Sequence, residues 1–326
     1  MARQTATGQI LLTGATGFVG RNLYPRLVER NYQVRCATRD AARAERKWPH
    51  RQWVQMDVER PVSLRRALQG CDAAYYLVHR MADVGDFESE EARGAMNFLE
   101  AATDLGVRRI VYLGGVRPAG QPAPHLRSRL VTGAILRSGE VSTVELQASM
   151  IIGPKSASWQ ILRDLAVRLP VMLCPRWLKN HTEPVAMDDA MAALLAAVEL
   201  ELEEGQSATF PIPGPDILTF RQCIETVSAL VGNRPWMVDV PFLTPRLSSY
   251  WLRVVTGADY HVAKALAEGL KDDLVADDDS YWERIDHRRR LPFREAAKRT
   301  LAAEEMEFNR YERAVHTLVE RRRGAE

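Results

Sequence analysis

The sequence predicts an α/β protein built on a doubly wound parallel sheet with helices on both faces. Strand-like and helix-like segments alternate through the first half of the chain, and the connections between them are short. Such β–α alternation implies parallel strands joined by right-handed crossovers. The candidate strand at 73–78 is nearly continuously apolar, which fits a strand covered on both faces. We therefore expect a sheet buried between two helical layers.

The expected elements follow one another in a regular order. Strands are predicted at 9–13, 33–38, 53–56, 73–78, 110–113 and 143–146. Helices are predicted between them, at 22–30, 63–68, 87–105 and 125–138. Ser63 is the expected N-cap of the second of these helices, since serine is a favoured helix-capping residue.

The rhythm changes after Gly153-Pro154, where prolines interrupt the chain and helices are predicted at 188–202 and 219–231. We expect a first domain over 8–154 and a smaller, irregular lobe over 155–290, interleaved with the first. This lobe should cover the carboxyl ends of the strands, where α/β proteins bind ligands. A charged helix is expected over 291–326, with a sparse apolar stripe at Leu301, Phe308, Val315 and Leu318. That stripe predicts docking on the same chain, with an oligomer contact as the alternative.

The overall composition excludes several classes of protein. The 326 residues are 46% hydrophobic and 26% charged, as in ordinary soluble domains. A net charge of +2 gives no reason to expect a nucleic-acid partner. We also expect no signal peptide, no transmembrane segment and a cytoplasmic location. The cysteines are scattered, without a CxxC pair or Cys/His cluster, so no metal site is expected: Cys36, Cys71, Cys174 and Cys223.

A glycine-rich loop carries the strongest functional signal. It follows the first strand, opens a helix, and consists of Thr13, Gly14, Ala15, Thr16, Gly17, Phe18, Val19 and Gly20. The first glycine permits a tight turn, the second lets the backbone approach a pyrophosphate, and the third lets the helix pack closely on the strand. The helix N-terminus adds N–H groups and a partial positive charge. This context predicts a Rossmann-type dinucleotide-binding domain.

The end of the second strand bears on which dinucleotide is bound. An acidic residue there would accept hydrogen bonds from the adenosine ribose, whereas Arg39 could fork onto a 2′-phosphate. NADP(H) is therefore favoured, although Asp40 follows directly and keeps NAD(H) open. Asp57 and Val58, after the third strand, are expected at the adenine edge.

A second group of candidates follows the fourth strand. Leu77, Val78 and His79 stand at its carboxyl end and should therefore lie along the nicotinamide half of the cleft. His79 is a candidate acid/base, with a purely structural histidine as the alternative.

These residues resemble the short-chain dehydrogenase/reductase superfamily in its extended and atypical branches. The matching segments are TGATGFVG, Asp57-Val58, GAMNFLEAA (94–102), IVYLGG (110–115) and IIGP (151–154). PHLRSR, LPVMLCPRW, GPDILTF and LTPRLSSYW are similar to bacterial NAD(P)-binding proteins of the NmrA-like and complex I accessory-subunit types. The resemblance covers most of residues 8–300. It implies backbone contacts to the nicotinamide from 149–152, which include Ile152.

The resemblance also implies a catalytic serine or threonine after the fifth strand and a Tyr-x-x-x-Lys on the next helix. Here Gly114 stands at the serine position, and His125 and Arg129 replace the tyrosine and lysine. At i and i+4 these two side chains should share one helix face. The usual proton-transfer apparatus is therefore expected to be missing.

Three interpretations of this departure stay open. His125 acts as the acid/base while Arg129 holds the ribose; or a quinone or conjugated acceptor is reduced without any tyrosine; or the protein senses the dinucleotide, as a regulator or assembly factor, without turnover. His125 as a simple helix cap is a further alternative. An oxidoreductase acting on a small apolar acceptor is the function we expect. Its pocket would be lined by a group of large side chains that could equally pack in a core: Trp159, Met172, Trp177, Tyr250 and Trp251.

Overall fold

The computed structural model describes residues 8–79, 87–169, 171–203, 205–240, 268–269 and 271–306. Its centre is a seven-stranded sheet in the order β11-β6-β5-β4-β1-β2-β3, with every pairing parallel. The predicted doubly wound sheet is thus confirmed. The strands are β1 (Gln9–Leu12), β2 (Gln33–Thr38), β3 (Gln52–Gln55), β4 (Ala73–Tyr76), β5 (Arg109–Gly115), β6 (Ser142–Ala148) and β11 (Ala208–Pro211).

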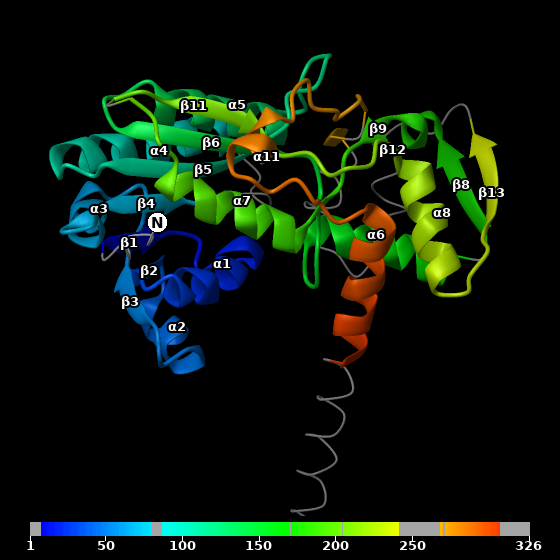
Figure 1. The fold of residues 1–326 in the computed structure, drawn as a ribbon, viewed down its shortest axis with the longest axis horizontal. Coiled ribbons are helices and arrows are strands. Elements are labelled where there is room, and N and C mark those ends of the chain that lie inside the picture. The colour runs from blue at the N-terminus through cyan, green and yellow to red at the C-terminus, as the bar shows by residue number, and fades with distance from the viewer. Residues whose placement is uncertain are drawn as a thin grey trace, which may run out of the picture.

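The order of the strands reverses between β1 and β4, and ligands bind at the carboxyl ends of strands at such a switch point. Helices cover both faces of the sheet (Figure 1). On one face lie α1 (Phe18–Glu29) and α7 (Met187–Glu199), and on the other α3 (Pro61–Leu68), α4 (Phe87–Asp104) and α5 (Pro124–Arg137). A further short helix, α2 (Ala41–Lys47), contacts β2 and β3.

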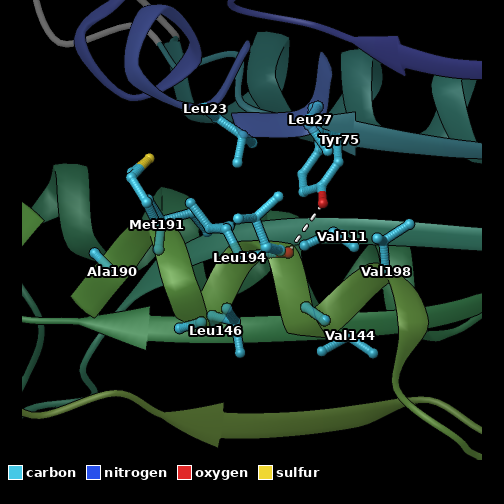
Figure 2. Close-up of a cluster of buried hydrophobic side chains, with 14 of the residues drawn as sticks. Leu23, Leu27, Tyr75, Val111, Val144, Leu146, Ala190, Met191, Leu194 and Val198 are labelled. Carbon is cyan, nitrogen blue, oxygen red and sulfur yellow. Dashed lines mark hydrogen bonds between the residues drawn. The ribbon is translucent and has the colours of Figure 1, made fainter. Parts of the chain in front are cut away.

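Helix α7 fits the sheet because its apolar residues recur at helical spacing. Ala190, Met191, Leu194 and Val198 form one buried face. Figure 2 shows this face against the strand residues Val111, Val144 and Leu146 and the α1 residues Leu23 and Leu27. The hydroxyl of Tyr75 on β4 donates to the carbonyl of Leu194 at 2.9 Å, which satisfies a buried polar group. Strand β4 and helix α7 are therefore joined by both apolar packing and a hydrogen bond.

A second, smaller hydrophobic core lies beyond the sheet, in the region of α6 and α8 (Figure 1). Trp159, Leu162, Phe220 and Phe293 are among its buried members. Its elements are α6 (Ala157–Arg168), β8 (Val171–Pro175), the 3-10 turn η1 (Arg176–Lys179), β9 (His181–Thr182), β12 (Leu218–Thr219), α8 (Phe220–Leu230), β13 (Trp236–Val240) and a helix over 293–306. The pair β7 (Ile151–Ile152) and β10 (Val185–Ala186) lies next to it, and α11 (Ser280–Arg284) packs against the sheet.

The structure corrects two helix starts and adds several elements. Helix α1 begins at Phe18, four residues before its predicted start at 22. The predicted N-cap Ser63 is wrong, because α3 begins at Pro61, whose fixed φ suits the first helical position. Ser63 instead donates to the carbonyl of Arg60 at 2.8 Å. Neither α2, α6 nor the short strands of the second core were predicted. The edge strand β11 was missed as well, since its proline obscures the pattern of a strand.

The C-terminal region follows the expected helix as far as residue 306. Phe293, Ala296 and Ala297 are buried in the second core, with Leu301 packed against it. The stripe residues Phe308, Val315 and Leu318 lie outside the described residues. Within the described part of the chain, no helix combines the length and apolarity needed to cross a bilayer.

Candidate active site

The glycine loop joins β1 to α1 at the switch point of the sheet. The hydroxyl of Thr13 donates to the carbonyl of Tyr75 and accepts the N–H of Leu77, both at 2.8 Å, which ties the end of β1 to β4. Gly14 has φ +61°, where L side chains are strained. A Cβ on Gly14 would also lie 2.4 Å from the carbonyl oxygen of Leu77. This glycine is therefore required by the turn itself.

The other two glycines of the loop have different surroundings. A Cβ on Gly20 would lie 2.4 Å from the carbonyl oxygen of Gly14 and 2.8 Å from Cα of Ala15, so Gly20 allows α1 to approach the loop. Gly17, the N-cap of α1, has only the Gly14 carbonyl nearby, at 3.2 Å from the added Cβ. Gly17 also lines an open cleft. Atoms of the protein itself thus leave no space for a side chain at Gly14 and Gly20, whereas the space beside Gly17 is open to a ligand.

The cleft continues from the glycine loop along the carboxyl ends of β4, β5 and β6. Several predicted residues line it: Gly14, Gly17, Phe18, Val19, Gly20, Leu77, Val78, His79 and Arg129. Ala15 is buried beneath the loop, and Thr16 is exposed at its outer side. At two predicted positions a neighbour lines the cleft instead, Leu113 next to Gly114 and Ile151 next to Ile152. A Cβ on Gly114 would meet the side chains of Glu145 and Tyr112, so this glycine is enclosed by its neighbours.

The predicted adenosine residues lie apart from this cleft. Arg39 is exposed at the end of β2. Asp40 caps α2, because its carboxylate accepts the N–H of Arg43 at 2.9 Å. Asp57 accepts the N–H of Glu59 at 3.1 Å in the turn after β3. The carbonyl of Val58 accepts the side-chain amide of Asn97 at 3.0 Å, which fastens this turn to α4.

His79 belongs to a polar cluster at the part of the cleft where β4 and β5 end. Its Nδ1 lies 2.9 Å from Oε1 of Glu91 on α4, whose side chain is only 9% exposed. The other carboxylate oxygen of Glu91 accepts the hydroxyl of Ser128 on α5. Nε2 of His79 is buried and has no hydrogen-bond partner among the described residues. Burial lowers the pKa of His79; the Glu91 hydrogen bond raises it, and the nearby Arg129 lowers it again.

His125 and Arg129 share one face of α5, as their spacing predicts, and both line a second pocket. Burial lowers the pKa of His125 to about 4, and the charges of Arg129 and His79 act in the same direction. His125 forms no side-chain cap in α5, whose N-cap is Ala123. Nη2 of Arg129 donates to the carbonyls of Leu113 and Gly114, each at 3.0 Å. Arg129 thereby fixes the end of β5.

The second pocket is predominantly apolar and adjoins the cleft. Leu126, Ile161, Leu162, Leu165, Phe220 and Ile224 are among its lining residues. Arg129, Ala148, Ser149 and Ser158 line both spaces, so the pocket meets the cleft at the ends of β5 and β6. Of the large residues predicted for a substrate pocket, Trp177 lines it, whereas Trp159 and Met172 are buried in the second core. Tyr250 and Trp251 lie outside the described residues.

Sequence reasoning missed several polar residues of the site. Glu91 is one of several acidic residues in the FESEEAR segment, and nothing in that segment distinguishes it from its neighbours. Tyr112 lines the cleft from β5, and burial raises its pKa to about 12. Lys155, Ser156 and Ser158 follow the IIGP turn, whose likeness to known proteins was the only signal pointing to this region.

Comparison with known proteins agrees with this geometry. Residues 14–166 match the NAD(P)H-binding family model. Cinnamoyl-CoA reductase 1 of Oryza sativa subsp. japonica is 30% identical over 111 residues, covering 32% of this chain and 33% of that protein. The chain thus aligns with about a third of this relative's length. Ceramide reductase of Caulobacter vibrioides is 26% identical over 72% of this chain and 74% of its own. The photosystem II assembly factor Ycf39 of Synechocystis sp. is 21% identical over 75% and 74%.

Solved structures share the fold across most of the chain. The NADPH complex of the quinone oxidoreductase QOR2 from Escherichia coli superposes with a TM-score of 0.70 at 20% identity, covering 89% of this chain and 99% of that one. The Citrobacter sp. triphenylmethane reductase, complexed with NADP(H), gives 0.68 at 17% identity, covering 90% and 99%. Residues 14–166 are thus similar to the NAD(P)H-binding family, and the solved structures show the same fold.

Proposed function

We propose that the protein is an NADPH-dependent reductase for a small apolar acceptor of the quinone or enone type. One observation carries this proposal: the apolar pocket and the dinucleotide cleft share Arg129, Ala148, Ser149 and Ser158. An acceptor in the pocket would therefore meet a dinucleotide in the cleft at the carboxyl ends of β5 and β6. Bound NADPH supplies a hydride, and the acceptor needs one proton in addition.

The residues of the cleft fit a dinucleotide. The space beside Gly17 and the N-terminus of α1 suit the pyrophosphate, because backbone N–H groups and the helix dipole favour anions there. Exposed Arg39 would hold a 2′-phosphate. Asp40, the residue that favours NAD(H) by type, accepts a backbone hydrogen bond as a helix cap. QOR2 and triphenylmethane reductase are described as complexes with NADPH and NADP(H), which supports the same choice.

We assign proton delivery to His79 and orientation of the acceptor to His125 and Arg129. With its pKa near 4, His125 is neutral at pH 7 and holds no proton to donate as an acid. Burial also lowers the pKa of His79, so this group must take up a proton before it can deliver one, and the Glu91 carboxylate on its Nδ1 side stabilises the protonated ring when it does. Unlike the charges of Arg129 and His79 that act on His125, this carboxylate partly offsets the effect of burial, and His79 lines the cleft. His79, held by Glu91, would pass one proton from solvent to the reduced acceptor. The reduction then balances as one hydride from NADPH plus one proton.

Anaerobic mixing of the protein with NADPH and 1,4-naphthoquinone tests this function. We expect the absorbance of NADPH at 340 nm to fall in step with hydroquinone formation, with a weaker response to NADH. Cyclohexenone serves as the enone acceptor in parallel. Tight NADPH binding with no oxidation by either acceptor would contradict the proposal.

A dinucleotide-sensing assembly factor is the second candidate. It is favoured by the similarity to Ycf39 over 75% of the chain and by His125 and Arg129 in place of Tyr-x-x-x-Lys. A sensor should bind one oxidation state of the dinucleotide much more tightly than the other. Calorimetric titration with NADPH and NADP⁺ measures that difference directly.

A further inference from the structure

Two residues that line the apolar pocket from the second lobe carry a buried polar atom without a hydrogen-bond partner among the described residues. Trp177 on η1 and Thr182 on β9 both line the pocket, and neither lines the dinucleotide cleft. Thr182 is completely buried. Nε1 of Trp177 and the hydroxyl of Thr182 are buried atoms with no hydrogen-bond partner among the described residues. Both leave hydrogen-bonding capacity unused, which is unfavourable unless a ligand or water satisfies it.

The chemistry of these atoms restricts what can satisfy them. An indole N–H only donates, and a threonine hydroxyl can donate as well, so an acceptor oxygen is the partner that suits either atom. Arg129 is the only cationic side chain among the described residues that line this pocket, and it lies where the pocket meets the cleft. A carboxylate held by Trp177 and Thr182 would thus have no counter-charge beside it. A neutral carbonyl oxygen on an apolar body fits better.

We propose that Trp177 and Thr182 form a subsite for a second carbonyl oxygen of the substrate, remote from the carbonyl that lies at the cleft. This inference rests on the proposed function, since it assumes that the pocket receives the acceptor. It selects, within that function, a two-oxygen acceptor such as a para-quinone over an enone with one carbonyl. The first oxygen meets the polar groups shared with the cleft, and the second meets the lobe.

Binding to the NADP⁺-loaded protein tests the subsite without any turnover. The probes are 1,4-naphthoquinone and α-tetralone, bicyclic ketones of similar size; tetralone lacks the second carbonyl and the ring double bond, and the variants below separate the effect of the carbonyl. We expect naphthoquinone to bind on the order of tenfold more tightly by calorimetry, because tetralone leaves the subsite unsatisfied. All four cysteines are free thiols but buried, which protects them from direct attack by the quinone.

Conservative variants show whether the subsite causes the difference. Thr182→Val keeps the shape of the side chain but removes the hydroxyl, and Trp177→Phe removes the indole N–H. Each should reduce the preference for naphthoquinone to about twofold or less, while Thr182→Ser retains it. Thr182→Val should unfold at the same temperature as the wild type or higher, because it removes an unsatisfied buried hydroxyl.

Three results would overturn the subsite. Equal binding of the two probes by the wild type would show that no second oxygen is recognised there. A preference that survives in the Thr182→Val/Trp177→Phe double variant would place its cause elsewhere. A clear loss of stability in Thr182→Val would mean that the hydroxyl is bound within the protein. Tighter binding of naphthoquinone without any oxidation of NADPH would refute the reductase function but support the subsite. Oxidation of NADPH by naphthoquinone without tighter binding than tetralone would support the reductase function but refute the subsite.

Discussion

Nδ1 of His79 lies 2.9 Å from a carboxylate oxygen of Glu91, although the two residues come from the end of β4 and from α4. The bond fixes which nitrogen of the imidazole faces the carboxylate and leaves the buried Nε2 without a hydrogen-bond partner among the described residues. Ser128 holds the other oxygen of Glu91, so the carboxylate is anchored from α5 as well. A carboxylate behind a histidine orients the ring and stabilises its protonated form.

Replacing Glu91 with Gln should lower the rate of acceptor reduction on the order of a hundredfold and leave the Kd for NADPH nearly unchanged. The negative charge of Glu91 raises the pKa of His79, so the acidic pKa of the pH–rate profile should move to lower pH in the variant. Steady-state rates from pH 5 to 9 measure both effects. Glu88→Gln is the matched control, since Glu88 lies on the same helix and pairs with the exposed Arg127. An unshifted profile for Glu91→Gln would show that Glu91 does not act through His79.

Alanine at Gly17 should reduce dinucleotide affinity, whereas alanine at Gly20 should reduce the stability of the fold. Gly17→Ala should weaken all dinucleotides on the order of tenfold or more with little loss of stability, because its Cβ would project beside the cleft. Gly20→Ala should cost about 1–3 kcal/mol of stability, because its Cβ would overlap the Gly14 carbonyl. Calorimetry and urea unfolding separate the two effects. Unchanged affinity in Gly17→Ala would remove the glycine loop from the binding site.

Replacing Arg39 with Ala should weaken NADPH by about tenfold or more and NADH by less than about twofold. The physical reason is that the Arg39 guanidinium would bind the 2′-phosphate, which NADPH carries and NADH lacks. Arg46→Ala, an exposed arginine near the end of α2, is the control for a general loss of positive charge. Equal losses for the two cofactors would show that the 2′-phosphate contact lies elsewhere.

His125 should make the folded protein sensitive to acid. Its pKa is about 4 in the folded state and 6.5 in the unfolded chain, so between these values only the unfolded state binds the extra proton. Stability is therefore complete above pH 6.5 and decreases as the pH falls towards 4, by about 3 kcal/mol from this group.

The difference in unfolding free energy between pH 7 and pH 4.5, measured in urea, should be smaller for His125→Gln than for the wild type. Exposed His50→Gln should behave like the wild type. The same acid sensitivity in all three proteins would mean that His125 is not buried in its neutral form.

The sequence alone determined six of the seven strands of the sheet, all but β11, and the position of the glycine loop. Period-two and period-3.6 patterns, short connections and fixed glycine spacing are local properties, and they predicted β2 with its observed bounds and α4 to within one residue. The spacing of His125 and Arg129 also placed them on one helix face.

Only the tertiary structure decided which residues meet. Glu91 reaches His79, and Trp177 and Thr182 share a pocket with α5, because strand order and helix packing bring distant segments together. Burial decided the charge of His125, since desolvation is the largest cause that lowers its pKa, followed by Arg129 on the same helix and by His79 from the end of β4. Local patterns specify how a segment folds, whereas the environment of a side chain depends on all the segments packed around it.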